Sequence, residues 1–329
     1  MKKLIALYLC LCLLAGLCAG CVENAAPVDG PTETTVVTAK EQLDGKKIIF
    51  LGNSRTYYGK CVLDKGQTVF SQAERSNDQG YFYQVCKANG VDVNVTNFTF
   101  GNHSLKDFYS GSCAANRGHD GHNHLEDLTD RDYDYVVLQC GAGSKDATSA
   151  LNECQPLMDL FLAGNPNTKF VCLVHNAVHS DNYAWRSNIK ELEEAGVLVV
   201  DWGELVDDLI NSRVEVPGGT QTYSKYSFIV NKSATDGYHP NVLTGYITAQ
   251  MLYCAITGES AQGQAYSFWN DAAVNAAFDM EAYMDTYYAY DSEVNSNTNF
   301  AEIFGSQADM AGLQKLMDQY LEAKNYRDY

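Results

Sequence analysis

The sequence carries little positive charge. Its 329 residues include 23 Lys and Arg against 41 Asp and Glu, for a formal net charge of −18. A chain this acidic repels phosphate backbones and anionic lipid, so nucleic acid is not expected as a partner. No internal repeat is evident, and the length suits one large α/β domain with an appendage.

Cysteines with metal-type spacing are absent as well. Of the 11 cysteines, four fall within the first 21 residues and the rest are scattered through apparent strands, helices and loops. We expect at most one or two disulfides and favour Cys61 and Cys113, because their surroundings look like loops. Cys140 and Cys172 lie at predicted strand ends, where small buried hydrophobes are expected.

A hydrophobic run long enough to span a bilayer is also missing. Two lysines precede an apolar segment at 4–17, which is shorter than the ~20 residues that a span needs. Small residues then lead into Cys21, the layout of a secretory signal peptide over residues 1–20. This layout resembles a bacterial lipobox, which implies that Cys21 is lipidated and anchors the exported protein to the bacterial cell surface. The composition of residues 21–40 predicts a flexible tether.

The next 219 residues, 41–259, alternate between two kinds of pattern. Short apolar runs that are rich in β-branched residues predict strands at 46–52, 91–96, 134–140, 169–175 and 197–201. Helical spacing predicts helices at 79–88, 147–163, 182–195, 202–210 and 241–257. Apolar strands that alternate with helices are typical of a parallel sheet covered on both faces, so we predict a three-layer α/β/α sandwich with five parallel strands.

The last part of the chain, residues 260–329, shows no strand pattern. It is rich in aromatic residues at helical spacing. We therefore predict a C-terminal helical extension packed on the sandwich, with a separate domain as the alternative.

The first predicted strand ends in Gly52-Asn53-Ser54. Ligands of open α/β sheets bind outside the carboxyl ends of the strands, so the Ser54 hydroxyl is well placed to meet one. The alternative is a plain turn followed by a helix N-cap, because turns and caps prefer these residue types.

A second candidate segment lies near the other end of the domain. Asp236 precedes His239 by three residues, in a glycine-bearing turn before a predicted helix. The carboxylate can hold one ring nitrogen while the other takes a proton from a serine, which makes Ser54, His239 and Asp236 candidates for nucleophile, base and orienter. The alternative is a structural helix start at Pro240, with Asp236 capping the turn and His239 partly buried.

These segments resemble the blocks of the SGNH (GDSL-type) hydrolase superfamily. Gly52-Asn53-Ser54 resembles its opening Gly-Asp-Ser, 236–240 resembles its closing Asp-x-x-His, and Gly101-Asn102 resembles its second block. The resemblance covers roughly residues 46–259. It implies a flavodoxin-like sandwich that hydrolyses carboxylic esters, often acetyl groups on sugars, through a serine nucleophile and without a cofactor.

The resemblance also implies an oxyanion hole, and there the sequence departs from the family. The N–H groups of Ser54 and Gly101 are expected to donate to the oxyanion. The block Gly-x-Asn-Asp, whose asparagine is a further donor, is missing, and the matching strand ends in Gln139. A variant branch of exported bacterial proteins carries a similar glutamine, which makes Gln139 a candidate replacement.

Loss of one oxyanion donor typically lowers turnover by ~10²–10³, so a second function stays open. It is a catalytically weak or inactive lipoprotein that binds glycans or surfaces on the same scaffold. Asn53, Asn102 and His175, near the expected site, are candidates for substrate contact, and an acylated carbohydrate is the expected partner.

A histidine-rich segment spans residues 119–124. Three imidazoles and a carboxylate are ordinary zinc ligands, but a polar loop without a following helix does not fix their geometry. We therefore expect no metal, and interpret the segment as solvated surface or as a loop over the active-site rim. A metal-dependent hydrolase that uses these histidines is a third, weaker alternative.

Overall fold

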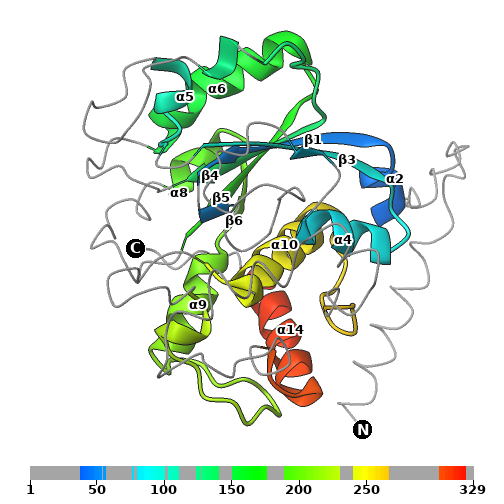
Figure 1. Ribbon diagram of the computed structural model, residues 1–329, viewed down its shortest axis with the longest axis vertical. Coiled ribbons are helices and arrows are strands. Elements are labelled where there is room, and N and C mark those ends of the chain that lie inside the picture. Colours follow the sequence, from blue (N-terminus) through cyan, green and yellow to red (C-terminus); the bar gives the residue numbers. More distant parts are fainter. Residues whose placement is uncertain are drawn as a thin grey trace, which may run out of the picture. The chain divides into compact units, whose positions relative to one another are not determined.

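A six-stranded sheet forms the centre of the protein in a computed structural model (Figure 1). Five strands run parallel in the order β3-β1-β4-β5-β6, and β2 pairs antiparallel with β3 at the edge. The strands are β1 (Lys46–Gly52), β2 (Ser76–Asn77), β3 (Val93–Thr99), β4 (Tyr135–Cys140), β5 (Lys169–Val174) and β6 (Leu198–Val200). The predicted five-stranded parallel sheet is thus confirmed, and β2 is a short addition that the sequence did not predict.

The structure describes part of the chain, and all of that part belongs to one unit, Thr38–Tyr329. The described residues are 38–53, 55–56, 76–77, 80–100, 103–110, 124–126, 128–140, 150–175, 189–229, 240–266 and 304–323. The predicted signal peptide and most of the predicted tether therefore lie outside the described residues.

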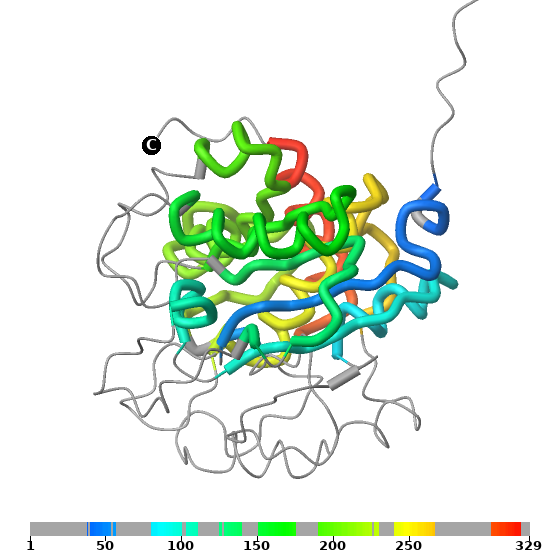
Figure 2. The backbone as a smooth tube through the Cα atoms, turned by 90° about the horizontal axis from the view of Figure 1, so that it is seen from above, coloured from blue at the N-terminus to red at the C-terminus, as the bar shows by residue number. Residues whose placement is uncertain are grey.

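Helices cover both faces of the sheet (Figures 1 and 2). They are α2 (Ala39–Leu43), α4 (Tyr81–Ala88), α5 (Asp107–Ser110), α6 (Ala150–Gly164), α8 (Ile189–Glu194), α9 (Trp202–Ile210), α10 (Val242–Thr257) and α14 (Gln307–Glu322), with 3₁₀ turns η1 (His124–Glu126) and η2 (Lys225–Ser227). α5 and α6 lie on one side, and α4, α9, α10 and α14 lie on the other.

Alternation along β1 explains the two layers of core. Ile48 and Phe50 belong to the core cluster that contains the side chains of α4, α9, α10 and α14. Ile49 and Leu51 point to the opposite face and belong to the cluster that contains the side chains of α6. Successive strand residues face opposite sides, so a strand that is apolar throughout is buried on both, which confirms the three-layer sandwich.

The C-terminal helix α14 packs on α10 and α9. A capping box between Ser306 and Asp309 starts it, and Leu313, Leu316 and Met317 are buried in the core cluster on the α10 side. Full burial of such a side chain contributes about 1.5–3 kcal/mol, so α14 is a structural part of the sandwich.

Two expectations need correction. The helix α2 begins at Ala39 behind a Thr38–Glu41 capping box, inside the segment predicted as tether. Cys172 is buried, as expected, but it is disulfide-bonded and not a simple buried hydrophobe. The favoured pair, Cys61 and Cys113, lies outside the described residues. None of the described helices is both long and apolar enough to span a membrane.

Candidate active site

The strand order places a topological switch point between β1 and β4. From β1 the chain first adds β3 on one side of the sheet and later adds β4 on the other. Figure 2 shows the blue β1 running between the cyan β3 and the green β4. In flavodoxin-like sheets the connections leave the carboxyl ends of two such strands in opposite directions, and ligands bind in the crevice between them.

A pair of buried carboxamides lies at this switch point. The Asn53 N–H donates to Gln139 Oε1 at 3.0 Å, and Gln139 Nε2 donates to Asn53 Oδ1 at 2.7 Å. Only 6% of Asn53 and 3% of Gln139 is exposed. Two reciprocal bonds therefore join the turn after β1 to the end of β4.

The same two side chains bond to three further groups. Asn53 Nδ2 donates to the carbonyl oxygen of His103 at 2.8 Å, and the Arg55 N–H donates to Asn53 Oδ1 at 3.0 Å. The Thr56 hydroxyl donates to Gln139 Oε1. We call this set of groups the carboxamide network: Asn53, Thr56, Gln139 and the His103 carbonyl. It links the residues that follow β1 and β3 to the end of β4.

Gly52 makes room for this network. A Cβ built on Gly52 would lie 2.7 Å from both Gln139 Cβ and Gln139 Oε1, and 2.5 Å from Thr56 Oγ1. Distances below 3.0 Å are not seen for real Cβ atoms. A glycine is therefore favoured at position 52, because the side chains of Gln139 and Thr56 leave no room for a Cβ atom.

The loop after β3 is held on both sides of the predicted Gly101-Asn102 block. Before the block, the Phe100 N–H donates to the Gly52 carbonyl oxygen at 3.0 Å. After it, His103 is 98% buried and packs against Phe100 and Phe108, with ring centroids 5.4 and 6.0 Å away. The residues that flank the block are therefore fixed next to the turn that follows β1.

The closing block is anchored at its C-terminal end. Pro240 forms an isolated bridge with Ile229, and the Asn241 N–H donates to the Phe228 carbonyl oxygen at 3.0 Å. The Asn241 side chain accepts from the Thr244 N–H at 3.1 Å, which caps α10. The helix start that follows His239 is thus firmly held.

His175, a predicted substrate contact, follows β5 directly. It is 8% exposed, and its ring meets the Trp202 ring edge-on at 5.2 Å between centroids. The side chain is thus mostly covered.

Three of the predicted site residues can be placed. The structure brings Asn53 and Gln139 together and places His175 beyond β5, whereas the other predicted site residues lie outside the described residues: Ser54, Gly101, Asn102, Cys21, Asp236 and His239. Sequence reasoning missed Thr56 and the His103 carbonyl. No local pattern indicates either, because a main-chain acceptor has no residue signature and the Thr56 hydroxyl has its partner 83 residues away in the sequence.

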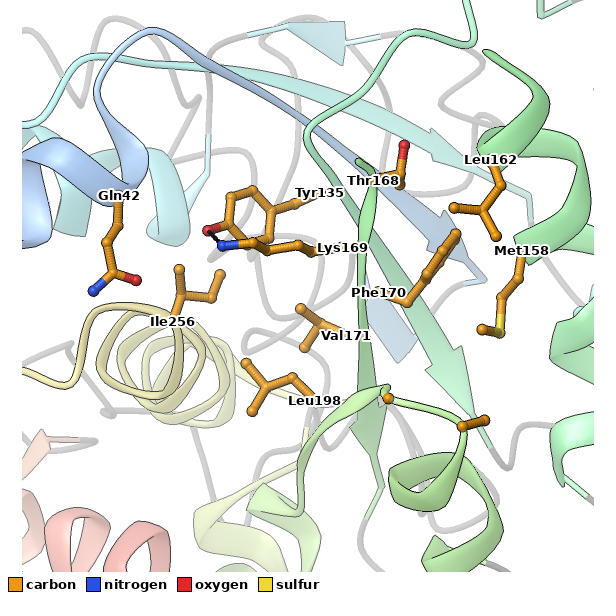
Figure 3. A pocket seen from close by; sticks show the side chains of 12 residues that line it. Gln42, Tyr135, Met158, Leu162, Thr168, Lys169, Phe170, Val171, Leu198 and Ile256 are labelled. Carbon is orange, nitrogen blue, oxygen red and sulfur yellow. Dashed lines mark hydrogen bonds between the residues drawn. The ribbon is translucent and has the colours of Figure 1, made fainter. Parts of the chain in front are cut away.

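A cavity of about 380 Å³ lies at the amino ends of the strands (Figure 3). It is lined at the start of the strands by Tyr135, Lys169 and Leu198, with Ile256 of α10 and Met158 of α6. Lys169 Nζ lies 3.5 Å from the Tyr135 hydroxyl and 5.4 Å from the centre of its ring. The cavity is therefore separate from the candidate site, which lies at the carboxyl ends.

Within the described residues, no three His, Cys, Asp or Glu side chains gather in a way that could hold a metal ion. Most of the histidine-rich segment lies outside this part of the chain; His124 begins η1.

No family model and no curated protein matches the chain. Among solved structures it is similar to the acetylxylan esterase Axe2 of Geobacillus stearothermophilus, at 16% identity and a TM-score of 0.42 over 66% of this chain and 96% of that one. It is also similar to a GDSL-like lipase of Parabacteroides merdae, at 17% identity and a TM-score of 0.43 over 66% and 97%. The fold assignment rests on the sheet described above.

Proposed function

We propose that the protein is a serine ester hydrolase that removes O-acyl groups, O-acetyl groups first among them, from carbohydrate. The observation that carries this proposal is the carboxamide network. It holds the residue before Ser54 in a buried turn at the switch point of the sheet, where a nucleophile has to be presented.

In the proposed reaction, Ser54 Oγ attacks the ester carbonyl while His239 takes its proton. Asp236 holds the imidazole in the required tautomer and stabilises its charged form. The Ser54 and Gly101 N–H groups stabilise the oxyanion. The sugar hydroxyl leaves with the proton from His239, and water, deprotonated by His239, then releases the acyl group as a carboxylate.

The decisive experiment uses a fluorophosphonate probe and a short-chain acyl ester. The parent protein is expected to label and to hydrolyse the ester, and Ser54→Ala is expected to do neither. Equal labelling or hydrolysis by Ser54→Ala would refute the assignment. A series of acetylated oligosaccharides then tests the substrate class by acetate release.

One observation favours a second candidate, a glycan-binding protein with little or no catalysis. The Gln139 carboxamide, which the sequence offers as a third oxyanion donor, is already bonded to Asn53 and Thr56. A parent protein that binds acetylated glycans but neither labels nor hydrolyses would support this alternative.

We also propose that the domain is held at the bacterial cell surface by a lipid on Cys21. The proposal rests on the sequence before the domain. A Cys21→Ala variant, expressed with its leader, is expected to leave the detergent phase of a Triton X-114 partition. Retention in that phase would refute the anchor.

A further inference from the structure

We propose that Gln139 is a positioning residue of the ester hydrolase, acting through Asn53 to fix the Ser54 turn, and that it is not an oxyanion donor. This inference rests on the proposed function, because a positioning role requires a reaction at Ser54. It gives a role to the residue that replaces the missing Gly-x-Asn-Asp block.

Main-chain groups determine the orientation of both carboxamides. The Asn53 N–H can only donate, so it requires the oxygen of Gln139, which leaves Gln139 Nε2 to face Asn53. The Arg55 N–H likewise requires the oxygen of Asn53, and the His103 carbonyl requires its nitrogen. Neither amide can be turned over without breaking two bonds, so the network has one arrangement.

The Gln139 side chain is also closely packed. It lies against Gly52, where even a methyl group would come within 2.7 Å of it, and only 3% of the residue is exposed. One of the two N–H groups on its nitrogen donates to Asn53 Oδ1 at 2.7 Å, and the other belongs to the same buried side chain. The carboxamide is therefore bound to the turn after β1, and in this proposal the oxyanion contacts are assigned to the N–H groups of Ser54 and Gly101 alone.

A single isosteric change isolates the nitrogen of Gln139. Gln139→Glu keeps the acceptor that Asn53 N–H and Thr56 require, but it puts an oxygen against Asn53 Oδ1. In its ionised form, the introduced carboxyl group places an oxygen against the acceptor Asn53 Oδ1 in a buried site, so burial and repulsion raise its pKa. In its protonated form, it can donate to Asn53 Oδ1 and restore the bond. Stability is thus present below the unfolded pKa of ~4.3 and is lost as pH rises through the raised folded value.

The experiment compares the parent with Gln139→Glu on the full domain. At pH 8 the variant is expected to show an unfolding equilibrium constant ~10–100-fold larger, the cost of one unsatisfied buried acceptor. Its kcat is expected to fall ~10–100-fold with KM changed little, because misplacement of reacting groups acts on the chemical step. Both ratios to the parent are expected to recover as pH falls toward 5. Gln307→Glu is the matched control, since Gln307 is exposed at the start of α14.

A second pair of variants acts on the network without touching Gln139. Thr56→Val removes the hydroxyl that bonds Gln139 Oε1 and is expected to lower kcat by ~5-fold, the worth of one hydrogen bond. Thr56→Ser keeps the hydroxyl and is expected to restore the parent rate.

Two results would overturn the inference while leaving the proposed function intact. One is a parent that labels with fluorophosphonate while Gln139→Glu and Thr56→Val turn over at the parent rate. The other is a loss of turnover in Gln139→Glu without any pH-dependent loss of stability, which would indicate direct contact with the substrate oxygen. A parent that neither labels nor hydrolyses would refute the proposed function itself, and the positioning role with it.

Discussion

Replacing Gly52 by alanine tests the geometry of the candidate site most directly. Gly52 is not among the described residues with positive φ, so alanine can adopt its backbone conformation and the effect is one of space alone. The new methyl group would lie 2.7 Å from Gln139 Cβ, an atom that cannot move without moving β4, and 2.5 Å from Thr56 Oγ1.

The magnitude follows from the two ways in which the structure can respond. If β1 and β4 shift apart, the cost is that of overpacking a core, about 1–3 kcal/mol. Rotation of the Gln139 side chain would relieve the contact with Oε1 but not the contact with Cβ, and it would also cost the Asn53 N–H and the Thr56 hydroxyl their acceptor, at about 1–3 kcal/mol. The strands therefore have to shift, and we expect Gly52→Ala to reduce the free energy of unfolding by about 2 kcal/mol.

Urea unfolding of Gly52→Ala and of the parent measures this loss, with an unchanged m-value as the sign that the folded state is otherwise intact. A shift of β1 also moves the turn that follows it, so the rate of fluorophosphonate labelling at Ser54 is expected to fall at least ~10-fold as well. The labelling rate is measured without urea, under conditions in which both proteins are folded.

Gly164→Ala is the control. A Cβ on Gly164 would lie 2.6 Å from the Arg131 carbonyl oxygen, a clash of similar size at the end of α6. This variant is expected to lose comparable stability and to keep the parent labelling rate. If Gly52→Ala were as stable and as reactive as the parent, or if both variants lost the same reactivity, the account of Gly52 would be wrong.

Three further predictions concern single side chains. Asn53→Asp puts a carboxylate oxygen against the His103 carbonyl, so we expect about 1–3 kcal/mol less stability at pH 8 by urea unfolding, recovering as pH falls. Burial opposes the charge of Asp309, but bonds from the Ser306 hydroxyl and from the N–H groups of Gln221, Thr220 and Ser306 outweigh it and lower its pKa to about 2. The parent should lose about 2 kcal/mol relative to Asp309→Asn between pH 4 and pH 2, where stability from a lowered pKa is lost. Burial and the Glu153 charge raise the pKa of the Cys154 thiol to about 12, so iodoacetamide should modify it, by mass spectrometry, only after unfolding.

The sequence was sufficient for the architecture because each strand carries its own signal. The apolar run of β1 and the alternation at the start of β3 are local patterns, and burial on both faces follows from them. The helix α10 was recognisable at both ends, since Asn241 caps it and Gly258, at φ 74°, ends it in the left-handed conformation.

Other features depend on contacts that no local pattern encodes. The helix α2 has only five residues and lies in a polar segment. The Thr and Glu residues that form its capping box, Thr38 and Glu41, are also typical of a flexible tether, so the sequence does not distinguish the two. The strand β2 has two residues and exists through its pairing with Thr96 and Asn97 of β3. Such elements are decided by their tertiary neighbours.

The role of Gln139 could not be predicted because it depends on which strands are neighbours. Asn53 and Gln139 are 86 residues apart in sequence, and they meet because β4 crosses over to lie beside β1. The last ladder pair, Leu51 with Leu138, brings Gly52 opposite Gln139 one residue further on. A comparison of the sequence with the family blocks, one position at a time, does not show that residues 53 and 139 are in contact.

The chain departs from the SGNH blocks that it resembles at two places: Asn53 stands where the opening block has aspartate, and the strand that ends in Gln139 lacks the Gly-x-Asn-Asp block. The geometry joins these two departures into one feature. Gln139 Nε2 requires an acceptor at position 53, and the His103 carbonyl requires a donor there. Asparagine supplies both with one side chain, whereas an ionised aspartate supplies no donor. Asn53 in the opening block is therefore the partner that a glutamine at the end of β4 demands, and each substitution makes physical sense in the presence of the other.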